Sequence, residues 1–512
     1  MFETLKSSDW SYEKAAHLLS RANMAATRNE RIALYELGRD QGVEAAVDSL
    51  VRAADDWENF PFPDWWDGKN VDTGPADSRT GSGDQFIQWY FQQLLEANPL
   101  GAKMFKFLVD HAPINASLLI EQNRYIYFFQ HFDLCRKHAL GNFKSFVEGI
   151  SWDGGMIWML DLKSSVRGNL NENFGRELLE LFTLGVNGGY TEEDVVACSR
   201  VFTGRTAPTK QPDDWPYKPF LNDREWPPQS WADHYYLYID TDEITLLGET
   251  LTGFTPDDEG EERTNHGPEA LDVIFEQPAC GEYLVWKFWR YFVAPDPPEA
   301  LVQELGERFR TIHDYELRPL LKDIFMSEAF YAPENIGSQI KDAGDYLVSC
   351  MKALDVGLPS PRVTYVTLEN MGYNAMLPPS IAGWPEPERE GNGWLGAEKT
   401  LFRVNLPLLW LEESFAMFDR TGGTTPRSLY DEVPPTDFKL DRVAPGQFRG
   451  GRDLNLLLDE LNDRLLPFHR LSTRQREFLI ENDERNYREL DEESRVRELI
   501  RVIMALPEFQ LQ

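Results

Sequence analysis

Apolar residues recur at steps of three and four along most of the chain, which is the spacing that places them on one face of an α-helix. Few strand-like runs interrupt this pattern. The helical segments that it predicts are 84–97, 100–111, 115–139, 142–150, 155–162, 172–184, 191–203, 267–277, 280–293, 297–312, 316–328, 333–354 and 397–418. We therefore expect an all-α fold with long ordered loops and at most a minor β-hairpin.

Two stretches, 56–82 and 205–266, break the helical pattern and are rich in proline and tryptophan. We expect both to be ordered, because burying one aromatic ring against the helices is worth roughly 1.5–3 kcal/mol. Within the second stretch, the runs HYYLYI and ITLLGETL flank a polar turn at 240–243. Such runs predict a small hairpin near 235–249.

Composition divides the chain into three parts. Residues 1–418 form the main helical body, and residues 419–450 are a polar strap or linker rich in glycine and proline. Residues 451–512 return to the helical pattern. We expect this C-terminal segment to pack on the main body.

The stretch from Asn169 to Arg205 reads as a helix, a glycine-rich turn and a second helix. Gly185 ends the first helix, because glycine adopts the left-handed conformation without penalty. Thr191 begins the second helix, and Asp194 three residues later completes a variant of the capping box. This stretch organises the region around it, since both helix ends are set by local chemistry.

The same stretch also carries a family resemblance. The run NENFGRELLELFTLGVNGGYTEEDV, followed by FTG, is joined by RKHALGNF from Arg136, KFWRYFV from Lys287, LPPSIAGWP from Leu377, and the ending IMALPEFQ. With these segments the chain resembles a bacterial family catalogued as domain of unknown function 1800, from about His17 to the C-terminus. The resemblance implies no particular activity.

The chain is strongly acidic, with 85 acidic residues against 51 basic ones and a net charge of −34. Such a surface repels phosphate backbones, so we expect no nucleic-acid partner. Acidic residues are spread along the whole chain, which favours a role in solubility over attraction of cations or basic partners.

No apolar run approaches the roughly 20 residues that a membrane-spanning helix needs. No signal peptide is visible after Met1, so the sequence predicts a cytoplasmic protein if Met1 is native and an exported one if a leader has been removed. The four cysteines form no CxxC pair. We expect four unpaired, mostly buried thiols.

The first group of candidate site residues lies at the start of the 172–184 helix. Carboxylates, amides and a guanidinium there could hold a hard cation or a sugar hydroxyl. The residues are Asn171, Glu172, Asn173, Arg176 and Glu177. The alternative is a solvated polar face on which Arg176 pairs with neighbouring carboxylates.

Histidines form the second group. His138 and His131 share one face of the 123–139 helix, and His138 lies in the RKHALGNF segment. With His111 and His234, His138 gives a weak metal-ligand set, for which a divalent cation such as zinc, manganese or iron would be the cofactor. The alternative is that these are core histidines with satisfied hydrogen bonds.

The loop PPSIAGWPEPEREGNGW supplies the third group. Trp384 and Trp394 present flat faces of the kind that hold sugar rings, and Arg403 on the next helix could contact an anion. The alternative is that the two tryptophans cap a hydrophobic core.

Together these groups predict a hydrolase- or lyase-type enzyme acting on a polymeric, glycan-like substrate, with Glu172, Glu177 and His138 as catalytic residues. The ligand would be a glycan or a small molecule. The alternative is a non-catalytic helical protein that binds or assembles with a protein partner. An enzyme requires a concave pocket lined by these motifs together.

Overall fold

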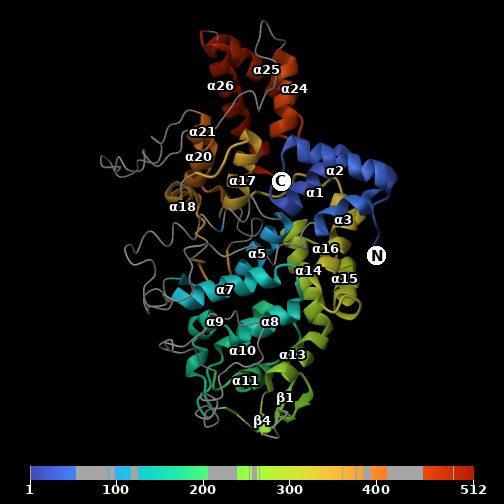
Figure 1. The fold of residues 1–512 in the computed structure, drawn as a ribbon, viewed down its shortest axis with the longest axis vertical. Helices are drawn as coiled ribbons and strands as arrows, with labels where there is room; N and C mark the ends of the chain where they lie inside the picture. The colour runs from blue at the N-terminus through green and yellow to red at the C-terminus, as the bar shows by residue number, and fades with distance from the viewer. Residues whose placement is uncertain are drawn as a thin grey trace, which may run out of the picture.

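The structure is a computed structural model that describes residues 2–52, 90, 99–116, 125–205, 239–240, 242–252, 254–256, 262–264, 266–359, 361–374, 377–384, 394–411, 454–487 and 489–512. These parts of the chain are predominantly α-helical, as the hydrophobic pattern predicts. The helices stack along one long axis, with the N-terminal helices near the middle and the C-terminal helices at one end (Figure 1).

One end of the molecule is built from the middle of the sequence. Its elements are α7 (Tyr125–His138), α8 (Phe143–Trp152), α9 (Gly154–Met159), the 3₁₀-helix η3 (Leu162–Ser164), α10 (Asn173–Glu177), the π-helix η4 (Leu178–Thr183), α11 (Glu192–Val201), β1 (Ile244–Leu246), β2 (Glu249–Leu251), β3 (Phe254–Pro256), β4 (Glu262–Thr264) and α13 (His266–Glu276). β1 pairs antiparallel with β2, and β3 with β4. The strands make only small two-stranded ribbons beside the helices.

The centre of the molecule joins N-terminal helices to later ones. It contains the 3₁₀-helices η1 (Ser7–Asp9) and η5 (Glu328–Tyr331) and the helices α1 (Tyr12–Asn23), α2 (Arg28–Gln41), α3 (Val43–Arg52), α5 (Pro99–His111), α14 (Pro278–Phe292), α15 (Glu299–Thr311) and α16 (Leu317–Met326). α14 and α15 cross closely at two glycines. A Cβ on Gly281 would lie only 2.4 Å from the carbonyl oxygen of Gly306. This contact fixes α14, which carries much of the site described below.

The other end holds α17 (Ala343–Leu354), α18 (Pro361–Asn370), α20 (Ala397–Asn405), α21 (Leu408–Leu411), α24 (Leu454–Leu465), α25 (Thr473–Asn482), the π-helix η7 (Asp483–Tyr487), α26 (Glu492–Met504) and the 3₁₀-helix η8 (Pro507–Gln510). The final residues run back to the centre, where Leu511 forms an isolated antiparallel bridge with Ile340. Arg497 on α26 donates to the carbonyl oxygen of Leu411, so the C-terminal helices are bonded to α21.

The local signals in the sequence are confirmed where they concern helix ends. Thr191 caps α11 through a capping box with Asp194, as predicted. Thr27 and Glu30 form the same arrangement at the start of α2. Gly185 has a φ of +81°, the left-handed conformation expected after the first helix of the glycine-turn stretch.

Four details differ from the predictions. The predicted 333–354 helix is helical only over Ala343–Leu354, and the chain before it is irregular, with Gly337 at a positive φ of +62°. The predicted 397–418 helix is interrupted after Asn405, because the ring of Pro407 prevents a continuous helix. The end of the 172–184 helix is a π-helix, in which the hydroxyl of Thr183 donates to the carbonyl of Leu178 at 2.5 Å. The run ITLLGETL, expected to be one arm of the hairpin, itself folds back as β1 and β2 around Leu247 and Gly248, both with positive φ. Residues 234–238 of the other expected arm lie outside the described residues.

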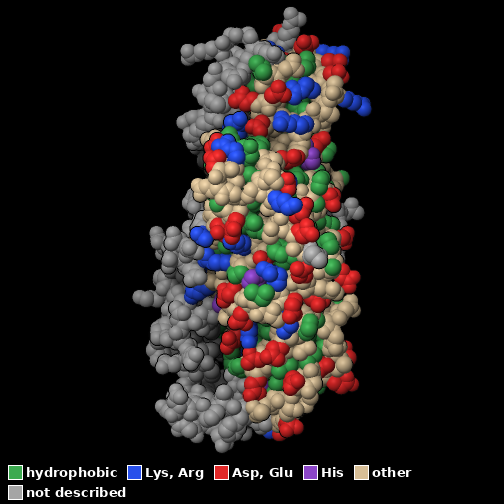
Figure 2. All heavy atoms as spheres, turned by 90° about the vertical axis from the view of Figure 1, so that its right-hand side faces the viewer, with side chains coloured by type: hydrophobic (Ala, Val, Ile, Leu, Met, Phe, Trp, Pro, Cys, Tyr) green, Lys and Arg blue, Asp and Glu red, His purple; other side chains and the backbone are tan. Residues whose placement is uncertain are grey.

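Several expectations concern residues outside the described part of the chain. They include the 56–82 break, residues 206–238 of the second break with His234, and the 419–450 strap. All four cysteines are described, and all are buried and unpaired, as predicted. No helix in the described ranges is long and apolar enough to cross a lipid bilayer. On the face shown in Figure 2, acidic side chains are spread along the molecule with basic ones between them.

Candidate functional site

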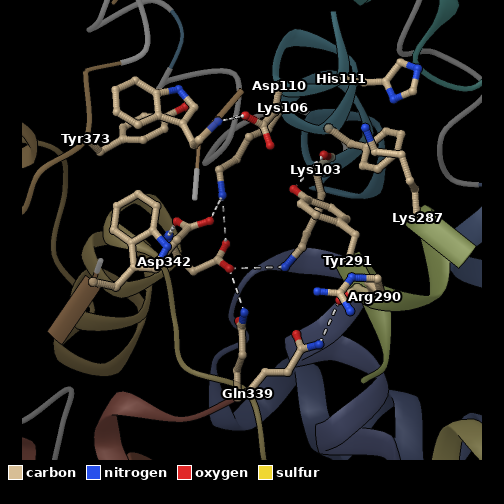
Figure 3. Close-up of a pocket in the computed structure, with 15 residues that line it drawn as sticks. Lys103, Lys106, Asp110, His111, Lys287, Arg290, Tyr291, Gln339, Asp342 and Tyr373 are labelled. Carbon is tan, nitrogen blue, oxygen red and sulfur yellow. Dashed lines mark hydrogen bonds and ion pairs between the residues drawn. The ribbon is translucent and has the colours of Figure 1, made fainter. Parts of the chain in front are cut away.

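Two adjoining hollows lie where α5, α14 and the 377–384 loop meet. The inner pocket is a polar cavity of about 80 Å³, and Figure 3 shows its lining residues. The outer groove is a larger hollow of about 720 Å³ beside it. Lys287 and Trp384 line both hollows, so the groove and the pocket adjoin at these two side chains.

Ion pairs between lysines of α5 and aspartates at the start of α17 form one wall of the inner pocket. Lys106 pairs with Asp342 and, at 3.7 Å, with Asp345. Lys103 lies 3.5 Å from Asp345, which also accepts from the Nε2 of Gln512 at 2.7 Å. These charges are almost fully buried, and each has an opposite charge beside it, which is the condition under which charges are tolerated in an interior.

Burial and ion pairing shift the pKa values of these buried groups in different directions. Burial lowers the pKa of Lys103 to about 8, partly offset by Asp345. Burial also disfavours the charge of Lys106, but Asp342 and Asp345 outweigh it and raise the pKa of Lys106 well above its usual value. Burial would raise the pKa of Asp345, and Lys103 and Lys106 instead hold it well below its usual range. Lys106 and Asp345 are therefore both charged at neutral pH.

Asp110 lies at the end of α5, and it is the carboxylate of the pocket that forms no ion pair with a lysine of the described residues. Its Oδ1 accepts from the backbone N–H of Trp384 at 2.7 Å (Figure 3). Burial raises the pKa of Asp110 to about 6, against the opposing effects of the Trp384 N–H and of Lys287. A carboxyl group with a pKa this close to neutrality can both take up and release a proton.

The contact between Asp110 and the 377–384 loop requires a glycine. Gly383 has a φ of +85°, and a Cβ there would lie 2.5 Å from both the backbone and the side-chain oxygen of Asp110. The backbone of the loop can therefore approach α5 only without a side chain at this position.

Aromatic side chains line both hollows. In the inner pocket, the ring of Tyr373 lies 5.0 Å from that of Trp384 and 6.3 Å from that of Trp394, between ring centroids. In the outer groove, Tyr283 and Trp286 of α14 are stacked at 6.0 Å with an angle of 17° between their planes. Flat apolar faces thus alternate with the charged groups.

The glycine-turn stretch forms one side of the outer groove. Its residues from Glu180 to Gly188 line the groove opposite Tyr283, whose hydroxyl donates to the carbonyl of Leu181 at 3.1 Å. The carbonyl of Phe182 lies 3.1 Å from the Nε2 of His111. The π-helix therefore connects the groove to the inner pocket through His111.

The structure brings together three of the predicted site residues. His111, Trp384 and Trp394 all line the inner pocket. Burial, helped by Lys287, holds the pKa of His111 well below its usual value, so this imidazole is neutral. Trp394 is 3% exposed, whereas Trp384 is only partly buried.

The predicted carboxylate group does not share that pocket. Neither hollow is lined by Glu172, Asn173, Arg176 or Glu177. Arg176 forms ion pairs with Glu172 at 3.4 Å, Glu180 at 3.3 Å and the exposed Glu192 at 2.7 Å. This is the solvated polar face that the sequence left as the alternative, and it arises because the apolar face of α10 is turned to the core.

Asn171 and Arg403, both predicted to bind a ligand, also lie outside the two hollows. The amide of Asn171 donates to the hydroxyl of Ser164 and its Oδ1 accepts from the N–H of Asn173, so the side chain holds the loop before α10. Arg403 is fully buried, donates to the carbonyl of Lys341 at 2.6 Å and lies over the ring of Tyr346. Neither residue lines the two hollows.

His138 is partly buried, and neither Glu172 nor Glu177 is among the charged groups that act on it. Burial lowers its pKa to about 4, and the charged side chains that act on it are Lys137 and Asp133. His138 therefore does not form one site with Glu172 and Glu177, the other two residues predicted to be catalytic. No group of His, Cys, Asp and Glu among the described residues could hold a metal ion, and His234 lies outside them.

Sequence reasoning missed the charged residues of the pocket, namely Lys103, Lys106, Asp110, Lys287, Asp342 and Asp345. Lys287 stands at the head of the KFWRYFV segment, and that segment could have drawn attention to it. Asp110 directly precedes His111, but nothing in the local pattern distinguishes it from a helix-end acid. Its partners come from residues 287 and 384.

The fold and the site define a helical protein with an aromatic-lined groove beside a pocket that is lined by charged and aromatic side chains. The chain belongs to the family described as Protein of unknown function (DUF1800), which matches residues 17–511. No curated protein and no solved structure matches the chain. Three segments of the family resemblance, at 177–188, 287–291 and 377–384, contribute residues to the two hollows.

Proposed function

We propose that the outer groove binds a polymeric, glycan-like substrate and that the inner pocket cleaves it by a lyase-type elimination, with Asp110 as acid and base. The observation that carries this inference is that Lys287 and Trp384 line both hollows, which places the groove next to the pocket. A polymer lying in the groove would pass Lys287 and Trp384 and present one unit to Asp110. This reaction belongs to the enzyme class that the sequence predicts, but its catalytic residue is Asp110 and not Glu172, Glu177 or His138.

The aromatic side chains support a glycan as the ligand. Stacked Tyr283 and Trp286 offer a flat face in the groove, and Trp384 offers another at the entrance of the pocket. Sugar rings have apolar C–H faces that pack on such side chains, while their hydroxyl groups need polar partners at the edges. Glu180 and Asn187 supply polar groups along the groove.

The charges favour elimination over hydrolysis. Hydrolysis of a glycosidic bond normally uses two carboxyl groups that flank the bond. Here Asp342 and Asp345 are held by lysines, which leaves Asp110 as the carboxyl group with a pKa near 6. Lys287 and Arg290 add positive charge to the same pocket. One acid-base group beside cations suits a uronic-acid unit, whose carboxylate the cations would neutralise.

The elimination is balanced without water or a further reactant. Deprotonated Asp110 removes the proton from the carbon next to the sugar carboxylate, and Lys287 stabilises the negative charge that develops there. The electron pair forms a carbon–carbon double bond as the bond to the neighbouring sugar oxygen breaks. Asp110 then returns its proton to that oxygen.

Wild-type protein incubated with a uronic-acid polymer and, separately, with a neutral polymer tests this function. Elimination creates a double bond conjugated to a carboxylate, which absorbs in the ultraviolet. We expect this absorbance only with the uronic-acid polymer, and Asp110→Asn should lower the rate by about 10²–10⁴-fold. Glu307→Gln on α15 is the matched control, because this exposed carboxylate lines neither hollow.

The other outcomes each identify a different function. New reducing ends without ultraviolet absorbance would indicate a hydrolase. Saturable binding without cleavage, lost on Trp286→Ala, would favour the non-catalytic binding protein. Neither binding nor cleavage of either polymer would contradict the assignment of a glycan ligand.

A further inference from the structure

A second cavity, separate from the groove and its pocket, lies where the N-terminal helices meet the C-terminal segment. Its volume is about 40 Å³. It is lined by residues of α1, α2, α17, α24 and η8, which come together near the C-terminus in Figure 1. Its polar lining residues include Arg31, Lys341, Ser349, Arg464 and Glu508.

Three cations line this small space although the chain as a whole is acidic. Arg31 is 3% exposed and Lys341 is 6% exposed. The Nη2 of Arg31 donates to the carbonyls of Asp463 and Arg464, at 3.0 and 3.2 Å, and the Nζ of Lys341 donates to the carbonyl of Phe509 at 2.8 Å. These bonds fix the side chains but supply no full negative charge.

The cations also repel one another. Burial lowers the pKa of Lys341 to about 8; Cys350 and Asp345 oppose this effect, and Arg403 and Arg31 add to it. Burial lowers the pKa of Arg464 as well; Asp355 opposes this effect, and Arg31 adds to it. Converging buried cations of this kind are stabilised by an anion between them.

Buried polar atoms of the lining residues have no hydrogen-bond partner within the described residues. They are the Nε of Arg31, the hydroxyl of Ser349 and the Oε2 of Glu508. The other carboxylate oxygen of Glu508 accepts from the Nε2 of Gln475 at 2.8 Å. Unsatisfied buried groups call for a partner, and this set comprises two donors and one acceptor.

Hydrogen phosphate matches this set, whereas sulfate does not. At neutral pH a phosphate ion accepts hydrogen bonds through its oxygens and still carries a proton that it can donate. Sulfate carries no proton, so it would place an oxygen against the carboxylate of Glu508. The volume is also suitable, because one water molecule needs about 10–15 Å³ of such a cavity and a tetrahedral oxyanion needs a few times more.

We propose that this cavity binds one inorganic phosphate ion, held by Arg31, Lys341 and Ser349 and recognised through its proton by Glu508. Because these residues belong to α2, α17, the segment before α17 and η8, the ion would tie the C-terminal segment to the N-terminal helices. The cavity shares no lining residue with the groove or the inner pocket.

Thermal unfolding of the full chain at pH 7 tests the site, with phosphate, sulfate and chloride compared at equal ionic strength. We expect phosphate to give a saturable rise in Tm of roughly 1–3 °C above the chloride value, and sulfate to give none. Equal effects of the three anions, or no effect of phosphate, would overturn the site.

Variants separate binding from folding. Ser349→Ala should weaken the phosphate midpoint about 10-fold, since it removes one hydrogen bond and little volume. Glu508→Gln should let sulfate raise Tm as phosphate does, because an amide can donate where the carboxylate cannot. Ser349→Ala and Glu508→Gln still test phosphate binding if the more disruptive Lys341→Met fails to fold. If Glu508→Gln still responds to phosphate and not to sulfate, Glu508 does not recognise the proton of the phosphate.

Discussion

Asp110 combines a shifted pKa with a position that only the tertiary structure creates. Its carboxyl group is enclosed by α5, by the 377–384 loop and by Lys287 of α14. Burial raises its pKa to about 6, so the folded state favours the protonated form relative to the unfolded chain. A group of this kind contributes stability below an unfolded pKa of about 3.9, and the contribution is lost as the pH rises through about 6.

Asp110→Asn should therefore stabilise the protein at pH 8. An amide keeps the acceptor for the Trp384 N–H and removes the ionisation. We expect a gain of about 1–2 kcal/mol, limited by the opening of the pocket to solvent, and no gain at pH 4. Thermal unfolding from pH 4 to 8 measures the difference, and a variant less stable than wild type at pH 8 would show that Asp110 is not strained by burial.

His131 shows the opposite case of a histidine held in the charged form. Its Nδ1 lies 3.0 Å from Asp153, its Nε2 lies 3.6 Å from the sulfur of Cys135, and all three residues are buried. Burial disfavours the charge, but Cys135 and Asp153 outweigh it and raise the pKa of His131 to about 10. This contribution to stability is complete below pH 6.5 and is lost as the pH rises through 10.

We expect His131→Phe to cost about 3–5 kcal/mol at pH 7, because it leaves Asp153 buried without its charge partner. Asp153 would keep only the N–H of Met156, 2.9 Å away. The loss in Tm on His131→Phe, compared with that on Cys135→Ala, measures the effect. Equal losses in the two variants would mean that packing, and not the ion pair, accounts for the cost.

At the scale of elements, the π-helix η4 positions both hollows at once. It ends at Thr183, and the left-handed conformation of Gly185, two residues later, turns the chain along the groove. A Cβ on Gly185 would lie 2.6 Å from the ring of Tyr283, so the turn is packed directly on α14. The glycine is therefore required both for its φ and for the contact.

Gly185→Ala should destabilise the protein by about 1–3 kcal/mol and weaken any ligand bound in the groove. Gly189→Ala is the matched control, because Gly189 has a φ of +85° but nothing within 4 Å of its Cβ. The control should lose only the backbone term of about 1 kcal/mol. The difference in Tm between the two variants isolates the contact with Tyr283, and its absence would contradict the packing described.

Elements set by neighbouring residues could be predicted from the sequence, whereas the site could be predicted only in part. The caps at Thr27 and Thr191 and the turn at Gly185 depend on residues three or four positions away. His111, Trp384 and Trp394 were identified by residue type, and the structure places them in one pocket. Asp110 could not be identified, because its pKa depends on groups at positions 287 and 384.

The α10 carboxylates are candidates for the site by sequence alone, because tertiary contacts cannot be derived from local spacing. Their spacing predicts a polar stripe but does not indicate what the stripe faces. Arg176, with its ion pairs to Glu180 and Glu192, shows that it faces solvent. Whether such a stripe faces solvent or lines a binding site depends on how other elements pack around it.

At the scale of the whole molecule, charge is the dominant feature. A net charge of −34 is spread along the chain, and Figure 2 shows acidic side chains along the length of one face. Like charges at this density repel one another in the compact state. Exposed ion pairs such as Lys144–Asp272 oppose this repulsion, but each such pair contributes only about 0–1 kcal/mol.

Added salt should therefore stabilise the protein. Raising sodium chloride from about 0.01 to 0.15 M shortens the screening length from about 30 to 8 Å. This screens the long-range repulsion among many carboxylates more than the short contacts within ion pairs, so we expect Tm to rise by a few degrees at pH 7. At pH 5 the rise should shrink, because protonation of carboxylates lowers the net charge. A Tm that falls with salt at pH 7 would show that the ion pairs outweigh the excess of acidic residues.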